Sequence, residues 1–182
     1  TTPIISVDEN KDVAIPDGSL TITTDDNTTQ LTLKSTDADA SIGPILDLMR
    51  DSASPAADDN LGALRFRGDD SGGNKTNYAF LNCFIEDPTD GAEDGLLKIE
   101  TRVNSSSKER ITMNSTETVF NDDSADLDFR VESNNNTHML FLDAGSDHVN
   151  FGTATDYGGV VNIESTDNNA TLVLACTDAD AS

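Results

Sequence analysis

Carboxylate and amide side chains gather at two places in the sequence with a spacing that could bind a hard cation. In residues 8–12, oxygen-bearing side chains alternate along the chain, and residues 122–128 place four aspartates near a predicted strand. Calcium prefers such oxygen ligands, but neither segment has the glycine and the bidentate glutamate that an EF-hand loop requires. We therefore expect solvated acidic turns, with Ca²⁺ binding as the alternative. The candidate ligands in these two runs are Asp8, Asn10, Asp12, Asp122 and Asp126.

The two histidines, His138 and His148, are the other side chains that could do chemistry. His138 lies in a predicted strand, where it could bind an ion jointly with its copies on the axis of a trimer. The sequence contains the residue types of a Ser/His/Asp triad, but it has neither a nucleophile elbow nor a glycine-rich phosphate loop. A carboxylate pair for glycoside cleavage can be drawn in any chain with 34 acidic residues. The sequence therefore predicts a protein that is not an enzyme and has no cofactor.

Six asparagines lie in N-x-Ser/Thr sequons. Turn chemistry accounts for most of them, because asparagine tolerates left-handed backbone angles and bonds to its own backbone. In an archaeal or eukaryotic extracellular setting the same side chains would be glycan acceptors. Residues 67–69 spell Arg-Gly-Asp, an integrin-type tripeptide, which we interpret as a turn at the end of a strand. The sequons are at Asn27, Asn74, Asn104, Asn114, Asn135 and Asn169.

The charge of the chain excludes two classes of partner. The 182 residues carry 34 Asp and Glu against 11 Lys and Arg, for a net charge of −23. Such a chain repels phosphate backbones and anionic lipid, so neither nucleic-acid binding nor membrane docking is expected. Only 35% of the residues are hydrophobic, and there is no apolar run near the length of a membrane span. Cys83 and Cys176 are too few for a disulfide framework and are interpreted as unpaired small apolar residues.

Alternation of apolar and polar residues predicts an all-β chain of short strands and polar turns. Residues 78–85 are apolar on both faces, which predicts a strand that is covered on two sides. A helical turn is conceivable only in residues 42–49, where Gly43 and Pro44 limit it. The low apolar content suggests that these strands bury apolar surface against other chains. The expected strands comprise residues 20–23, 31–34, 64–67, 97–103, 110–113, 127–132 and 149–151.

An internal repeat divides the chain. Residues 22–41 and 163–182 align without a gap at an offset of 141, and eleven of the twenty positions are identical. We therefore divide the chain into a lead-in segment (1–21), one full repeat unit (22–162) and the start of a second copy (163–182), and expect the natural polypeptide to continue. A weaker sub-repeat relates residues 131–142 to 163–174, each a short strand, an Asn/Asp-rich turn and a second strand, as in a hairpin.

Several blocks, in this order and spacing, resemble the repeat-bearing shafts of tail fibres from marine podovirus-type bacteriophages. The blocks are TDADASIGP (36–44), LDLMRDSASP (46–55), DNLGALRFRGDD (59–70), DGAEDGL (90–96), DFRVES (128–133), THMLFLDA (137–144) and VNFGT (149–153). The resemblance implies an elongated, homotrimeric, β-rich fibre that reaches from a virion to a surface glycan or protein receptor of the host. Neither a Ser–Lys self-cleaving chaperone domain nor a tail-attachment region is recognisable in the sequence.

Two other functions stay open on the sequence alone. One is a subunit of a bacterial or archaeal extracellular or cell-surface filament or adhesin, polymerised by strand complementation. The other is a polysaccharide-degrading tail spike, which would carry a carbohydrate groove and a close pair of acids. The leading expectation is a structural segment of a virion tail fibre, with host attachment as its role.

Overall fold

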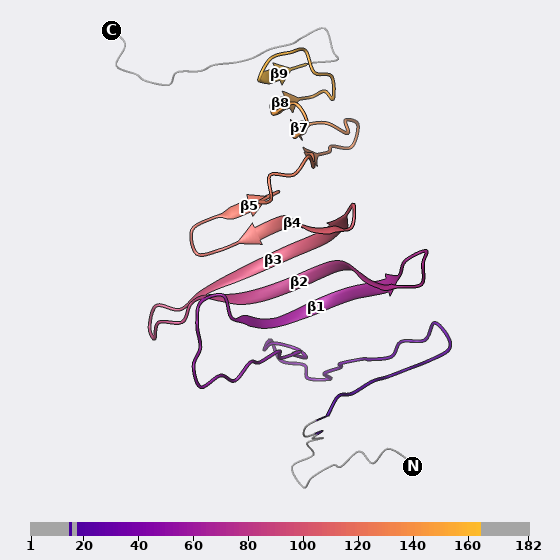
Figure 1. Cartoon of the computed structure of the whole chain (residues 1–182), viewed down its shortest axis with the longest axis vertical. Helices are drawn as coiled ribbons and strands as arrows, with labels where there is room; N and C mark the ends of the chain where they lie inside the picture. Colours follow the sequence, from indigo (N-terminus) through magenta and orange to yellow (C-terminus); the bar gives the residue numbers. More distant parts are fainter. Residues whose placement is uncertain (1–14, 16–17, 165–182) are drawn as a thin grey trace. The chain divides into compact units, whose positions relative to one another are not determined.

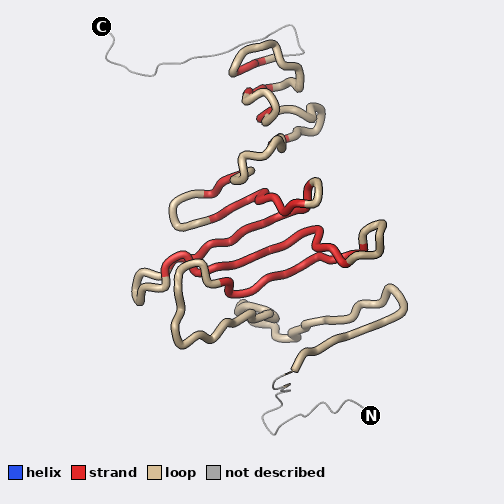
Figure 2. Tube along the Cα trace, viewed as in Figure 1, coloured by secondary structure: helices blue, strands red, loops and turns tan. Residues whose placement is uncertain are grey.

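The computed structural model describes residue 15 and residues 18–164. The described part of the chain is all-β, without a helix, and its strands form two sheets (Figures 1 and 2). The all-β class predicted from the alternation is thereby confirmed. The chain divides into two compact units, Thr1–Asp47 and Leu48–Ser182. Among the described residues, no helix could cross a membrane.

The first sheet is an antiparallel meander in which each strand pairs with the next one along the chain. Period-2 patterning and short turns favour this topology because consecutive strands need only tight connections. The predicted hairpin around residues 97–113 forms as β3 and β4. The sheet contains β1 (Asn60–Asp69), β2 (Lys75–Asp87), β3 (Asp94–Val103), β4 (Ser106–Met113) and β5 (Thr118–Phe120).

Polar turns fix the register of these hairpins. Between β1 and β2, the Asp70 carboxylate accepts hydrogen bonds from the Gly72 and Asn74 amides at 2.8 and 2.9 Å. These bonds, the one from Asn74 first, hold the pKa of Asp70 below its ordinary value. Between β3 and β4, Asn104 and Ser105 both have positive φ angles, 46° and 67°, as a tight two-residue turn needs. The chain therefore reverses within two residues, and β4 begins earlier than residue 110.

The second sheet follows in the same unit, with its four strands in chain order. Its first three strands are antiparallel, whereas the last strand runs parallel to its neighbour. The first two strands form the hairpin predicted for the first copy of the sub-repeat. The sheet contains β6 (Phe129–Val131), β7 (Leu140–Asp143), β8 (His148–Phe151) and β9 (Val161–Ile163).

The unit Thr1–Asp47 differs from the sequence-based expectation. Residues 20–23 and 31–34 were predicted as strands, but no strand forms there. The turn between them does form. The main-chain amide of Thr28 donates to the Asp26 carboxylate at 3.0 Å, and the side-chain amide of Gln30 donates to Thr24 Oγ1 at 2.9 Å. An alternating segment becomes a strand only when a partner completes its ladder. The helical turn considered for residues 42–49 is also absent.

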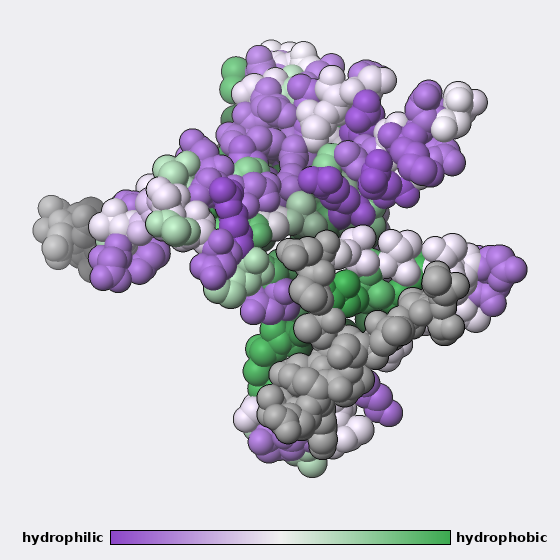
Figure 3. Space-filling view, turned by 60° about the horizontal axis from the view of Figure 1, so that its bottom comes forward, coloured by the Kyte–Doolittle hydropathy of each residue, from purple (hydrophilic) through white to green (hydrophobic). Residues whose placement is uncertain are grey.

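The described residues bury very little apolar surface. Phe141, 7% exposed, is the only buried large apolar side chain among them. Twenty-two large apolar side chains in the same part of the chain are exposed, and hydrophobic groups gather at the molecular surface in Figure 3. The buried polar side chains among the described residues are Thr112, Asn150, Thr153 and Asn162. Within one chain, the strands are therefore held by ladder hydrogen bonds and polar contacts more than by an apolar core.

Candidate functional site

One face of the five-stranded sheet is apolar across all five strands. The register places Leu64, Leu81, Ile99, Ile111 and Phe120 opposite one another in a single row. Residues that face each other across paired strands point to the same side of a sheet, so this row continues from one edge to the other. We call this surface the apolar face. Its members are Leu64, Phe66, Leu81, Cys83, Ile85, Leu97, Ile99, Ile111, Met113 and Phe120.

The apolar face is covered only in part by the described chain: Leu48 lies against Gly62 at its β1 edge, and most of its members are half-buried. Leu64, Phe66 and Phe120 are 42%, 57% and 51% exposed, and none of the other members is fully buried. Five strands about 4.8 Å apart and about 20 Å long give a patch of about 400 Å². The largest apolar patch of a typical monomer has about this area and is often functional. The apolar face is therefore the leading candidate for a binding surface.

The opposite face of the same sheet is polar and internally hydrogen-bonded. Lys98 Nζ donates to Glu109 Oε1 at 2.6 Å, and this hydrogen bond is the largest cause of the raised pKa of Lys98. Thr112, 4% exposed, donates its hydroxyl to Glu109 Oε2 at 2.9 Å. Across the neighbouring strands, the Asn82 amide donates to the Glu100 carboxylate. The two faces thus differ in chemistry, although the register places Lys108, opposite Thr101, on the same side as the apolar face.

Residues 78–85 now lie in β2, and the prediction of cover on both sides is not met within the described chain. Leu81, Cys83 and Ile85 belong to the apolar face, whereas Phe80 and Phe84 point to the polar side. All five side chains are only half-buried. This strand is the most apolar segment of the sheet, and its cover must come from elsewhere.

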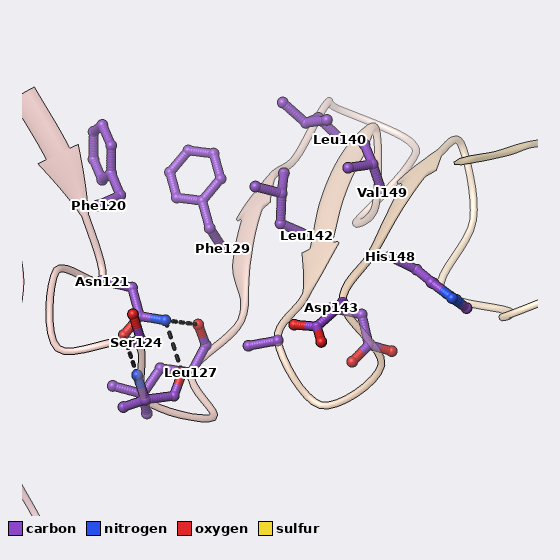
Figure 4. A pocket seen from close by; sticks show the side chains of 13 residues that line it. Phe120, Asn121, Ser124, Leu127, Phe129, Leu140, Leu142, Asp143, His148 and Val149 are labelled. Carbon is purple, nitrogen blue, oxygen red and sulfur yellow. Dashed lines mark hydrogen bonds between the residues drawn. The ribbon is translucent and has the colours of Figure 1, made fainter. Parts of the chain in front are cut away.

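A cavity of about 580 Å³ continues the apolar face beyond β5 (Figure 4). Phe120 belongs to both surfaces, and its ring centroid lies 4.9 Å from that of Phe129. Leu140 and Leu142 of β7 also line this space (Figure 4). The loop beside the cavity is held by Asn121, whose side-chain amide donates to the Ala125 carbonyl at 2.7 Å. An apolar side chain from a partner could occupy such a space.

The two histidine rings have different hydrogen-bond partners. His148 Nδ1 lies 2.9 Å from Asp156 Oδ1, and the pKa of Asp156 is lowered first by the Gly158 amide and then by His148. His138 lies in the turn before β7 and not in a strand as predicted, and its Nδ1 lies 2.9 Å from Thr137 Oγ1. In the part of the chain that the structure describes, neither histidine ring is hydrogen-bonded to a serine.

The candidate cation ligands are not brought together. Asp8, Asn10 and Asp12 lie outside the described residues. Asp122 lies near the Lys98 ammonium, whose pKa it helps to raise after Glu109, and His138 packs edge-on against the Phe141 ring at 5.1 Å. Asp126 lies beside Gly145. Over the described ranges, no group of three or more His, Cys, Asp or Glu side chains is arranged to hold a metal ion.

The sequons of the described residues all lie outside the strands. The Asn74 side chain bonds to Asp70 in the β1–β2 turn, and Asn114 Oδ1 accepts from the Thr116 and Glu117 amides, at 2.9 and 2.8 Å. At these two positions, the asparagines build turns. Asn27, Asn104 and Asn135 are exposed, and Asn169 lies outside the described residues.

The Arg-Gly-Asp tripeptide is not the turn that we expected. Arg67 and Gly68 continue the β1–β2 ladder opposite Asn77 and Thr76. Asp69 is the last residue of β1, and its Oδ1 lies 3.1 Å from Lys75 Nζ. The ladder therefore extends through the tripeptide, and the turn is displaced to the residues that follow it.

Two features of this region could not be read from the sequence. Phe120 lies in a three-residue strand without a recognisable pattern, and it joins the apolar face only through its pairing with Ile111. Asn150 and Asn162 meet only because β8 and β9 pair in parallel. For the members in β1, β3 and β4, alternation along the strand was a sufficient signal, whereas β2 is apolar on both sides.

No protein-family model matches the chain, and the search of curated proteins likewise returned no match.

Proposed function

We propose that this chain is a structural repeat segment of an extended viral tail fibre that mediates attachment to a host cell, and that it assembles as a homotrimer. The observation that carries the proposal is the apolar face, which spans five strands and of which Leu64, Phe66 and Phe120 are exposed within one chain. In the assembled fibre, the apolar faces of three chains cover one another. The role is structural rather than enzymatic, and its setting is the virion, outside the host cell.

The energetics favour association through this face. Burying about 400 Å² of apolar surface contributes about 10 kcal/mol per chain. Each of the two association steps of a trimer costs about 4–15 kcal/mol in lost translational and rotational freedom, so burial of the three faces is at least of the same order as this cost. The acidic residues on the other surfaces do not oppose this contact, whereas Lys108, which the register places on this side opposite Thr101, must stay in water or find a partner. The negative charge instead keeps assembled rods apart from one another.

The extended, repetitive character of the fibre is inferred from the sequence. The identity between residues 22–41 and 163–182 supports a unit that recurs along the polypeptide. The resemblance to phage tail-fibre shafts supports the virion as its setting. Receptor contact would fall on exposed polar turns, such as residues 69–74 and 105–108, where a host glycan or protein can approach.

A charge placed in the apolar face tests the proposal. Ile99→Lys lies in the middle row, whereas Ala63→Lys places the same charge on the polar side, opposite Asn82. We expect Ile99→Lys to weaken self-association at least about 100-fold, because an unpaired ammonium would be buried. Ala63→Lys should associate like the parent protein. Sedimentation velocity over a concentration series measures both.

Equal association of the parent protein and Ile99→Lys would refute a role for the apolar face. An open-ended helical polymer in place of a closed trimer would favour the extracellular filament. Circular dichroism of each variant establishes that the sheet is intact before the association constants are compared.

A further inference from the structure

The two ends of the five-stranded sheet differ in charge. In a meander, every second turn lies at the same end of the sheet. The β1–β2 and β3–β4 turns therefore share one end, and the β2–β3 and β4–β5 turns share the other (Figure 1). The first end, which lies beyond the row of Leu64 and Ile111, carries six of the 11 Lys and Arg residues of the chain, and we call it the arginine end. Its basic residues are Arg65, Arg67, Lys75, Arg102, Lys108 and Arg110.

The arginines of this end are exposed and have no acidic partner in their own chain. Arg65, Arg67 and Arg102 are exposed, and none of them forms an ion pair with another described residue. Asp69 is already paired with Lys75. Acids and bases balance at this end, because its acidic residues are Asp69, Asp70, Glu100, Glu109, Asp122 and Asp123.

The opposite end of the sheet, which we call the acidic end, has a large excess of negative charge. Its two turns, residues 88–93 and 114–117, contain neither lysine nor arginine. Arg50 lies at this end, but its Nη2 is 3.0 Å from Asp59 Oδ1, so its charge is already compensated. The acidic residues of the turns and the adjoining strand ends are Glu86, Asp87, Asp90, Glu93, Asp94 and Glu117, and all except Glu86 and Asp87 are exposed.

The direction of the chain through the sheet determines which surfaces meet in an assembly. The chain enters the sheet at β1 and leaves it at β5, and it advances by about 4.8 Å with each strand. In a fibre whose repeat units follow one another along the axis, the strands therefore lie across that axis. The two ends of each sheet then lie beside the two neighbouring chains. Threefold symmetry with the apolar faces inward brings the arginine end of one chain against the acidic end of the next.

We propose that the arginine end of each five-stranded sheet binds the acidic end of the neighbouring chain, in a head-to-tail contact that recurs around the trimer. Arg67 and Arg102 supply the cations that the neighbour's acidic end lacks. Lys108, which is half-buried on the side of the apolar face, obtains an acidic partner in the same contact. Charge complementarity thereby sets the direction in which the chains associate, while the apolar face provides most of the free energy. This inference rests on the proposed homotrimer.

An exchange of charge between the two ends tests the contact. Arg67→Glu with Arg102→Glu makes the arginine end acidic, and Asp90→Lys with Asp94→Lys makes the acidic end basic. All four side chains are exposed. We expect each double variant to associate at least about tenfold more weakly than the parent at about 0.1 M salt, because like charges then meet at every contact. The variant with all four substitutions keeps the net charge of −23 and should associate within about threefold of the parent, because the two ends are again complementary.

The double lysine variant separates this contact from the general repulsion between acidic chains. It makes the chain less negative, so general repulsion alone predicts stronger association, whereas the proposed contact predicts weaker association. Sedimentation velocity over a concentration series measures all variants, after circular dichroism has established that the sheet is intact.

Stronger or unchanged association of the double lysine variant overturns the proposal, and so does a fourfold variant that does not recover. With either result, a trimeric parent protein would still support the proposed function. A parent protein that stays monomeric overturns both.

Discussion

At the scale of single residues, polar side chains rather than apolar ones occupy the few buried positions. Asn150 and Asn162 illustrate this, since they bond to each other within the second sheet. The Asn162 amide also donates to the Gly159 carbonyl at 2.9 Å, so one side chain ties β9 both to β8 and to the loop before it. Removing one partner of a buried hydrogen bond leaves the other unsatisfied, which is costly.

Asn162→Ala should therefore lower the free energy of local unfolding of the β8–β9 pair by about 1–3 kcal/mol. Native-state hydrogen exchange of the His148–Phe151 amides measures this change. Asn134→Ala is the control, because Asn134 is exposed in the β6–β7 connection and its removal should have no measurable effect. An unchanged exchange rate in Asn162→Ala would show that the asparagine pair does not hold β9.

The turn at Asp70 should make the β1–β2 hairpin sensitive to acid. Because the pKa of Asp70 is lowered in the folded chain, first by the Asn74 amide, its stabilising effect is complete above the ordinary value of 3.8. The effect is lost as the pH falls below 3.8 and passes through the folded pKa. Asp70→Asn keeps an oxygen acceptor but does not titrate. Urea unfolding across this range should show the parent losing stability more steeply than the variant, and parallel curves would contradict the prediction.

At the scale of elements, the connection from β8 to β9 depends on one glycine. Gly152 has a φ of +81°, and a Cβ atom at this position would collide with the carbonyl oxygen of Glu164. Gly95 provides a contrast, because its surroundings are open within 4 Å and its φ is not in the left-handed region. The parallel pairing of β9 thus requires both the left-handed backbone and the missing side chain at Gly152.

Gly152→Ala should consequently displace β9, with a cost of about 1–2 kcal/mol from the backbone conformation alone. Gly95→Ala should leave the second sheet unchanged. Hydrogen exchange of the Val161–Ile163 amides compares the two variants. If both alanines are tolerated equally, the β8–β9 connection does not have the geometry described above.

The alternation in the sequence predicted most of the ladder-forming strands but not where they end. Residues 97–103 became most of β3, whereas β4 starts at Ser106 because Ser105 adopts a positive φ that serine rarely takes. Residues 20–23 and 31–34 have equally good patterns and form no strand. Local patterning specifies which side of a strand is apolar, but a ladder also needs a partner, and partners distant in the sequence carry no local signal. The members of the apolar face in β1, β3 and β4 were therefore predictable from alternation, whereas those in β2, Phe120 and the Asn150–Asn162 pair were not.

At the scale of the whole molecule, low apolar content and exposed apolar residues have one explanation. A chain with 35% hydrophobic residues and a net charge of −23 has little surface with which to build a core of its own. Part of its apolar surface lies on one face of the five-stranded sheet, and further large apolar side chains are exposed in residues 20–49 and in the second sheet. Such a distribution suits a chain whose core is completed by its copies.

The assembly state of the parent protein tests this account most directly. Native mass spectrometry combined with cryo-electron microscopy, at a concentration near that of an assembled fibre, gives both the number of chains and the form of the particle. We predict a particle of three chains in which the five-stranded sheets face one another. A compact monomer with the apolar face in contact with water at that concentration would contradict the account.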